Sequence, residues 1–176
     1  YLSTLGALAI ALPLFQITQK TKRKDGKIVP ISNSKSIYQH RNYYGIYKVA
    51  DVPLNPKDIF PQWSEKDPHF NEKGPILRTL WHGSTVHGTQ IIHPYTQKYP
   101  LSYYHSEGPL KYLLNKNKKK RNVAIIGLGV GACSTYFEEL EKITFYELDP
   151  SIVDIAENLF TYLSDCSASI TNVEGD

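Results

Sequence analysis

One short segment constrains the fold of this chain more than any other, the run Gly-Leu-Gly-Val-Gly at residues 127–131. It follows residues 123–126, which are apolar and typical of a short buried strand. Residues 131–140 are expected to form a helix. Glycines let the chain turn tightly and let a ligand approach the backbone without an intervening Cβ, while a helix start offers unpaired N–H groups. The segment therefore predicts a strand, a turn and a helix arranged to bind a nucleoside or nucleotide.

Two further strands and a helix are expected after the turn. Residues 143–147 and 169–173 have the composition of strands, and the residues between them show helical spacing. Asp149 supplies an N-cap and Pro150 a first-turn proline for that helix. Its apolar positions are Ile152, Ile155, Ala156, Leu159, Phe160 and Leu163. This alternation predicts a βαβαβ unit, the first half of a Rossmann-like, doubly wound α/β sheet.

Two carboxylates fall at the ends of the second and third strands. Glu147 lies twenty residues after Gly127, where a carboxylate can accept both ribose hydroxyl hydrogens, and Asp176 could reach an adenine amino group. We therefore interpret Gly127, Gly129, Gly131, Glu147 and Asp176 as nucleoside-binding residues. The lack of a third glycine placed for a pyrophosphate favours an adenosyl-sulfonium compound over a dinucleotide. The alternative is that the glycines only allow close helix–strand packing and that both carboxylates are surface residues.

The sequence before the glycine turn predicts a small antiparallel β region that ends near Tyr99. The expected strands, rich in aromatic and β-branched residues, are residues 42–49, 76–81 and 85–92. His82 and Gly83 predict a hairpin turn between the last two. Residues 52–75 contain five prolines and are expected to form a long loop.

The first fifteen residues carry no charged side chain and are interpreted as the end of a transmembrane helix. Five basic residues follow at positions 20–27, which by the positive-inside bias places the later residues on the cytoplasmic side. A signal peptide would carry its charges before the apolar run. A buried amphipathic helix remains the alternative. The predicted organisation is a transmembrane end at 1–16, a basic juxtamembrane linker at 17–36, an N-terminal β region at 37–115 and a nucleoside-binding domain at 116–176.

Charge and metal-ligand residue types exclude several other kinds of site. The net charge is only +3, and the basic cluster at residues 116–121 lacks interleaved aromatics, so a solvated surface loop is expected and no nucleic-acid partner. Cys133 and Cys166 show neither metal-ligand spacing nor a disulfide framework. His82 and His87 are five residues apart without a third ligand, which favours hydrogen bonding over metal binding. No metal site is therefore expected.

Several segments in combination resemble the spermidine synthases, a family of polyamine aminopropyltransferases. They read Val-Ala-Ile-Ile-Gly-Leu-Gly-Val-Gly at 123–131, Phe-Tyr-Glu-Leu-Asp-Pro at 145–150 and Val-Glu-Gly-Asp at 173–176. Leu-Trp-His-Gly at 80–83 is similar to the family's Leu-x-Asp-Gly hairpin, and Tyr104-His105 to its Tyr-His. The string at 82–90 is similar to one in bacterial membrane proteins whose transmembrane helices precede a synthase-like domain. The resemblance covers roughly residues 37–176.

The resemblance implies a fold, a reaction and a location. The fold is a Rossmann-like sheet of the methyltransferase type, and the reaction transfers an aminopropyl group from the co-substrate decarboxylated S-adenosylmethionine to an amine such as putrescine. Gln90, Tyr104 and His105 would contact this amine. The family's catalytic carboxylate would come after Asp176, so no catalytic residue is expected here and the chain alone is predicted to be inactive. The domain would be cytoplasmic at a bacterial inner membrane, and a homodimer is implied by the family alone.

The departures from the family concern the acids that surround the cationic amine. Val130 stands where the glycine turn of the family carries an aspartate, and Ser106 where a glutamate follows the Tyr-His. Pro100 and Leu101 replace an Asp-Glu pair. Two other functions therefore stay open, an S-adenosylmethionine-dependent methyltransferase and a non-catalytic nucleoside-sensing domain of a membrane transporter. For Tyr104 and His105 the alternative to amine binding is core packing.

Overall fold

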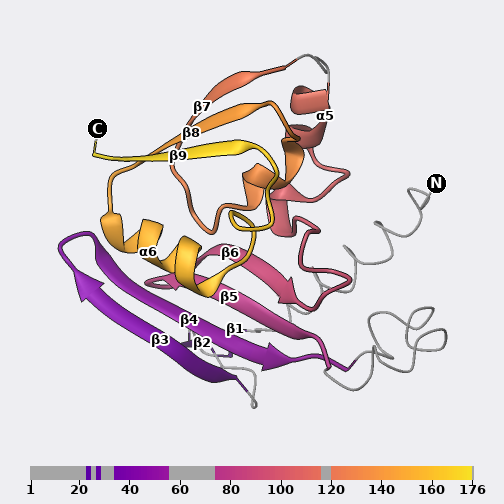
Figure 1. The fold of residues 1–176 in the computed structure, drawn as a ribbon. Helices are drawn as coiled ribbons and strands as arrows, with labels where there is room; N and C mark the ends of the chain where they lie inside the picture. The colour runs from indigo at the N-terminus through magenta and orange to yellow at the C-terminus, as the bar shows by residue number, and fades with distance from the viewer. Residues whose placement is uncertain (1–22, 25–26, 29–33, 56–73, 116–119, 176) are drawn as a thin grey trace. The chain divides into compact units, whose positions relative to one another are not determined.

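The structure is a computed structural model that describes residues 23–24, 27–28, 34–55, 74–115 and 120–175 (Figure 1). The chain divides between Thr96 and Gln97 into two compact units, which are described separately. The expected transmembrane end, most of the expected linker, the centre of the expected loop at 52–75 and Asp176 lie outside the described residues. In the part that is described, neither α-helix has the length and apolar character that a bilayer crossing requires.

The first unit contains an antiparallel sheet of four strands, which lie in the sheet in their order along the chain (Figure 1). The strands are β3 (Lys35–Asn42), β4 (Gly45–Pro53), β5 (Ile76–His82) and β6 (Thr85–Ile92). A separate short ladder pairs β1 (Arg23–Lys24) with β2 (Lys27–Ile28). The predicted antiparallel β region is therefore present.

The expected strand at residues 42–49 is wrong at its beginning, which is a turn. Oδ1 of Asn42 accepts the N–H groups of Tyr44 at 2.9 Å and of Gly45 at 3.2 Å. An asparagine that bonds its own backbone two and three residues ahead closes a turn. The chain therefore reverses between β3 and β4, and the residues from Lys35 onward form an additional strand that the alternation pattern did not predict.

The strands expected at residues 76–81 and 85–92 are confirmed as β5 and β6, and Gly83 turns between them with a φ of +58°. The side chains of Val49 on β4 and Leu80 on β5 are fully buried and lie opposite each other in the register. On the same strands Arg78 donates to Asp51 through Nε and Nη2, each at 2.8 Å from a carboxylate oxygen. Apolar burial and this cross-strand ion pair hold the sheet together.

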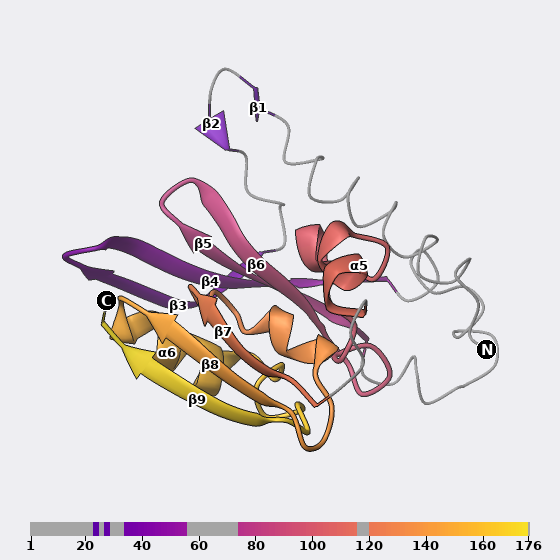
Figure 2. The ribbon, with the colours of Figure 1, turned by 90° about the horizontal axis from the view of Figure 1, so that it is seen from above.

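The second unit contains three parallel strands in the order β7-β8-β9 (Figure 2). They are β7 (Asn122–Ile126), β8 (Lys142–Glu147) and β9 (Ser169–Glu174), which confirms the three strands expected here. The helices are η1 (Ser102–Tyr104), α5 (Pro109–Asn115), η2 (Ala132–Tyr136) and α6 (Pro150–Leu159). The chain is thus a mixed α/β protein with a four-stranded antiparallel sheet and a separate three-stranded parallel sheet.

The helix α6 begins as expected, with the Asp149 side chain accepting the N–H of Ser151 at 2.9 Å and Pro150 in the first turn. It runs along one face of the parallel sheet (Figure 1), and its residues Ile155 and Ala156 are buried with Phe145 of β8. It ends at Leu159, and the helical pattern that suggested a continuation to Leu163 is not followed. Phe160 instead takes an extended conformation and is buried.

The helix expected at residues 131–140 is wrong, because only a five-residue 3₁₀ turn, η2, forms there. Side-chain hydroxyls bond to carbonyls in this stretch, Thr135 Oγ1 to Ala132 at 2.8 Å and Ser134 Oγ to Tyr162 at 2.9 Å. Residues that bond in this way compete with regular helix formation. Leu140 also has a left-handed φ of +72°, which no α-helix accommodates.

Candidate nucleoside site

The glycine turn joins the carboxyl end of β7 to η2. All three of its glycines have left-handed φ values, +85° for Gly127, +58° for Gly129 and +78° for Gly131. Any other residue is strained by about 1–2 kcal/mol in this conformation. The N–H of Gly127 donates to the carbonyl of Tyr146 at 2.8 Å, which fixes the start of the turn to β8. The shape of the turn therefore requires glycine at three positions.

Two of these glycines have different surroundings. A Cβ at Gly127 would meet no atom within 4 Å, so the turn is open on that side. A Cβ at Gly131 would lie 2.7 Å from Cδ2 of Leu163, well inside van der Waals contact. Gly131 is therefore required for close packing against Leu163. Gly127 leaves space in which a ligand could approach the main chain.

The side chains within the turn point into the core. Leu128 and Val130 are only 2% and 1% exposed, so their buried side chains fix the turn to the protein core. The N–H of Leu128 donates to Glu147, whereas within residues 120–175 the N–H groups of Gly129 and Val130 have no hydrogen-bond partner. Val130 itself cannot meet a bound molecule, because its side chain is buried in the protein.

Glu147 is the last residue of β8, and its carboxylate is fixed by two main-chain donors. Oε2 accepts the N–H of Leu128 at 2.9 Å, and Oε1 accepts the N–H of Asp149 at 3.1 Å. A carboxylate can accept about four hydrogen bonds, so roughly two sites remain. No ion pair to Glu147 occurs among the described residues. The next residue, Leu148, is 46% exposed at the same strand end.

The end of β9 lies beside Glu147, because the N–H of Gly175 donates to the carbonyl of Glu147 at 2.9 Å. Gly175 has a φ of +104°, and a Cβ there would meet no atom within 4 Å. Asp176, the expected adenine partner, lies outside the described residues. The structure therefore brings together the glycine turn, Glu147 and the chain segment that leads into Asp176.

Tyr104 and His105 belong to the second unit and are both half-buried. The carbonyl of Tyr104 accepts the hydroxyl of Tyr136, its ring lies 4.4 Å from that of Tyr103, and burial raises the pKa of its hydroxyl. Nδ1 of His105 accepts the N–H of Glu107 at 3.1 Å. One ring nitrogen of His105 is therefore occupied within its own loop, and only Nε2 is oriented away from that bond.

Gln90 belongs to the first unit. It lies on β6 opposite Arg78 and its side chain is fully buried within the folded unit. A residue with no exposed surface contacts a substrate only if its surroundings open. For Gln90 the structure therefore supports a structural role more directly than amine binding.

The histidine and cysteine side chains that were weighed as metal ligands have the following surroundings. His82 Nε2 lies 3.0 Å from the carbonyl of Tyr44, an acceptor, so this nitrogen carries a proton, and the His82 and His87 rings are 5.2 Å apart. In the described ranges no group of three histidine, cysteine or acidic side chains is placed to hold a metal. Burial raises the pKa of Cys133 to about 11, so its thiol stays protonated at neutral pH and is a poor nucleophile.

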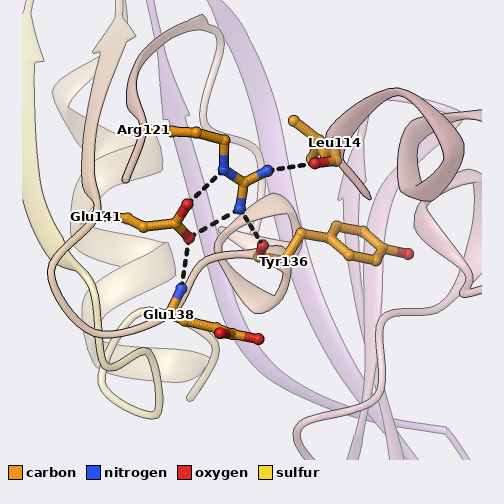
Figure 3. A network of polar contacts seen from close by, with 5 residues as sticks. All are labelled: Leu114, Arg121, Tyr136, Glu138 and Glu141. Atoms are coloured by element: carbon orange, nitrogen blue, oxygen red, sulfur yellow. Dashed lines mark hydrogen bonds and ion pairs between the residues drawn. The ribbon is translucent and has the colours of Figure 1, made fainter. Parts of the chain in front are cut away.

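A polar network at the opposite end of the parallel sheet was not predicted. Arg121 donates through Nε and Nη2 to both carboxylate oxygens of Glu141, and its Nη1 and Nη2 reach the carbonyls of Leu114 at 2.6 Å and Tyr136 at 2.9 Å (Figure 3). Oε2 of Glu141 also accepts the N–H of Glu138 at 2.8 Å. The guanidinium holds the pKa of the Glu141 carboxyl below its usual range.

The expectation of a solvated loop at residues 116–121 is therefore wrong for Arg121. The sequence does contain a signal for this pair, because Arg121 and Glu141 each immediately precede a strand of the same parallel sheet. The N–H of Lys142 donates to the carbonyl of Arg121 at 2.9 Å, so the two strand starts are adjacent. An arginine and a glutamate placed at neighbouring parallel strand starts can meet.

No protein-family model matches this chain, and no curated protein or solved structure matches it either. The case for a ligand therefore rests on the geometry of residues 127–131, Glu147 and Leu148. That geometry combines an open glycine turn, a fixed carboxylate with spare acceptor capacity and an exposed apolar side chain.

Proposed function

We propose that the second unit binds an adenosyl-sulfonium compound at the carboxyl ends of β7 and β8, as the nucleoside-binding part of a spermidine-synthase-like aminopropyltransferase. The observation that carries the proposal is the Glu147 carboxylate, which two main-chain N–H groups hold at the strand end beside the open glycine turn. The sheet order β7-β8-β9 also fits one half of a Rossmann-like sheet, in which ligands bind outside the carboxyl ends of the strands.

The remaining acceptor sites of Glu147 suit two neighbouring hydroxyl groups. A ribose offers such a pair, and each hydroxyl would donate a charge-assisted hydrogen bond to the carboxylate. Leu148 is exposed next to it and offers an apolar surface for the face of an adenine ring. A nucleoside therefore matches both the polar and the apolar part of this strand end.

The proposed reaction makes modest chemical demands on the protein. The nitrogen lone pair of the amine attacks the carbon beside the sulfonium, the new C–N bond forms as the C–S bond breaks, and the bonding electrons leave with the sulfur as a neutral thioether. The amine must be unprotonated to attack and loses a proton afterwards. The protein mainly orients the two reactants and supplies a base. The five basic residues at positions 20–27, within the linker expected at 17–36, support a cytoplasmic site at a membrane surface.

One observation favours a second candidate, a domain that senses a nucleoside without catalysis. The family that the chain resembles carries an acid at the position of Val130, whereas Val130 is apolar and only 1% exposed. His105 uses one ring nitrogen within its own loop. The nucleoside part of the site is thus better supported than the amine part.

Calorimetry on the full chain tests the shared step of both candidates. Decarboxylated S-adenosylmethionine and S-adenosylmethionine are titrated separately into the wild type, Glu147→Gln and Glu139→Gln. Because the glutamine loses two charge-assisted bonds, Glu147→Gln should weaken binding by about 10- to 100-fold. Glu139→Gln removes an exposed carboxylate elsewhere in the unit and should bind like the wild type. Failure of the wild type to bind either ligand would contradict the proposal.

Product analysis then separates the two candidates. The protein is incubated with decarboxylated S-adenosylmethionine and putrescine, and the aminopropyl product and the thioether are measured by mass spectrometry. Stoichiometric release of both identifies a transferase. Binding of the adenosyl compound without turnover, in a protein that also contains the catalytic segment expected after Asp176, identifies the sensing domain.

A further inference from the structure

Two tyrosine hydroxyls bind main-chain carbonyls of residues 99–104, in and just before the segment 102–108 that contains Tyr104 and His105. The hydroxyl of Tyr136 donates to the carbonyl of Tyr104, and the hydroxyl of Tyr162 donates to the carbonyl of Tyr99 at 3.0 Å. Tyr136 is the last residue of η2, which begins directly after Gly131. Tyr162 follows α6. Tyr136 is joined to the glycine turn through five residues of η2, whereas Tyr162 reaches the same region through a hydrogen bond of its carbonyl with Ser134 Oγ at 2.9 Å.

The stretch between the glycine turn and Tyr136 is fixed at short intervals. The N–H of Gly131 donates to Leu128 at 3.0 Å, and the N–H of Ser134 donates to Gly131 at 2.9 Å. Arg121 binds the carbonyl of Tyr136 at 2.9 Å (Figure 3). Because these hydrogen bonds restrain residues 128–136, a displacement of the glycine turn should also displace Tyr136.

Residues 102–108, which contain the acceptor of the Tyr136 hydroxyl, have few stabilising main-chain hydrogen bonds of their own. Ser102 has a φ of +58°, a left-handed conformation that costs a non-glycine residue free energy. Its main-chain bonds are short-range, with the N–H of His105 on the carbonyl of Ser102 at 3.2 Å and that of Gly108 on His105 at 2.8 Å. Segments of this kind open at lower free energy than the core, so an external bond can change their order.

The Tyr136 hydroxyl is suited to act as that bond. Partial burial raises the pKa of Tyr136 to about 12, so its hydroxyl keeps its proton at neutral pH. The hydroxyl therefore remains a donor to the Tyr104 carbonyl over the whole physiological range. Tyr104 and the adjacent His105 are the residues expected to face the second substrate.

We propose that Tyr136 is a positioning residue that couples the glycine turn to residues 102–108, so that an adenosyl ligand on the turn orders the segment facing the second substrate. This inference rests on the proposed adenosyl site. It adds an order of events, in which the nucleoside binds first and prepares the site for its partner. By thermodynamic linkage the ordered segment in turn strengthens nucleoside binding by the same factor.

Hydrogen exchange of the full chain, read by mass spectrometry with and without decarboxylated S-adenosylmethionine, tests this coupling. In the wild type the ligand should slow exchange at residues 102–108 by about 5-fold or more. Tyr136→Phe removes one oxygen atom and should lose the slowing, and its ligand binding should weaken by no more than the factor by which the ligand slows exchange in the wild type. Tyr162→Phe removes the matched hydroxyl on Tyr99 and should keep the slowing.

Each of the other results of the exchange experiment would contradict one part of the proposed coupling. Equal slowing in the wild type and in Tyr136→Phe shows that the hydroxyl does not couple the two parts. Loss of ligand binding in Tyr136→Phe shows that the hydroxyl builds the turn instead of transmitting its state. Loss of the slowing in Tyr162→Phe as well removes the special role of Tyr136. If the wild type binds no ligand, the adenosyl site itself fails, and the coupling with it.

Discussion

The two ends of β8 each carry a glutamate that accepts main-chain N–H groups, yet their surroundings differ. Glu141, just before the strand, accepts the N–H of Glu138 and both donors of Arg121, and its side chain is 9% exposed. Glu147, at the end of the strand, accepts two N–H groups and pairs with no cation in the described part of the chain. The first carboxylate has three of its roughly four acceptor sites filled and is paired with a cation, whereas the second has roughly two sites left for another molecule.

The difference between Glu141 and Glu147 suggests that the amino end of the parallel sheet contributes to stability and the carboxyl end to ligand binding. At the amino end, Arg121, Glu141 and neighbouring main-chain bonds tie together α5, η2 and the starts of β7, β8 and β9. At the carboxyl end, β7 leads into a turn with left-handed glycines and β9 leads into Gly175, and the surroundings of Gly127 and Gly175 are open. A ligand site needs groups that are fixed but not satisfied, and of the two ends of the parallel sheet, as far as the structure describes them, the carboxyl end offers them.

Arg121→Met should have the largest effect on stability. It leaves the Glu141 carboxylate buried without its cation, which costs about 3–5 kcal/mol of unfolding free energy. Urea denaturation followed by circular dichroism measures the loss. If the two strand ends have separate roles, the affinity for an adenosyl ligand should change less than about threefold under conditions where the variant is folded.

Lys120→Met is the matched control, because Lys120 is exposed and adjacent to Arg121. It should change the unfolding free energy by less than about 0.5 kcal/mol. A similar loss in both variants would show that the basic cluster acts through its overall charge. In that case the Arg121–Glu141 network would not be the main support of the amino end.

The two glycines at the carboxyl end should separate strain from packing. Gly131→Ala should lose about 2–4 kcal/mol, because it combines a strained φ with a Cβ only 2.7 Å from Leu163. Gly127→Ala has the strain without the overlap and should lose about 1–2 kcal/mol. Gly127→Ala should nevertheless weaken adenosyl binding more than Gly131→Ala does for the same loss of stability. The reason is that the Cβ at position 127 enters the open side of the turn.

Equal losses of stability in the two alanine variants would contradict this division. They would indicate that the side chain of Leu163 moves away from a Cβ at position 131 at little cost. The crystal structure of Gly131→Ala, or methyl NMR shifts of Leu163, would show whether that movement occurs.

The pH dependence of stability should identify Glu141 as a carboxylate stabilised by its ion pair. Arg121 lowers its pKa in the folded state, so the unfolded chain binds the proton more readily. The contribution is therefore fully present above the ordinary value of about 4.5 and is lost as the pH falls through the folded-state pKa. The stability difference between wild type and Glu141→Gln should shrink over this range. In Arg121→Met the same dependence should be reduced, and an unchanged dependence would contradict the role of the ion pair.

Local sequence signals predicted the elements whose formation depends on neighbouring residues. The strand expected at residues 123–126, which forms as β7, and the cap of α6 at Asp149 were predicted because apolar runs, an N-cap and a first-turn proline act over a few positions. The turn at Asn42 was missed because the tyrosines beside it have the composition of a strand. Here two hydrogen bonds to one side-chain oxygen outweighed residue propensity.

The incorrect helix after the glycine turn and the missed network depend on distant residues. Ser134 bonds to Tyr162, which lies 28 residues later, and this contact helps to replace an α-helix by the turn η2. Arg121 meets Glu141 only because β7 and β8 pair in parallel register. The positions of Gly127 and Glu147 could be predicted, since the end of one strand and the end of the next are adjacent in such a sheet.

Asp149→Ala should have the smallest effect and tests how independent the elements at the carboxyl end are. It removes the side-chain acceptor for Ser151 but leaves the main-chain N–H of Asp149 on Glu147. Loss of an N-cap costs about 1 kcal/mol, whereas Asp149→Asn keeps the acceptor oxygen and should lose less. Thermal unfolding of both variants measures this difference. If α6 only covers the sheet, adenosyl affinity should be unchanged in both, and a parallel loss of affinity would show that the cap also sets the position of Glu147.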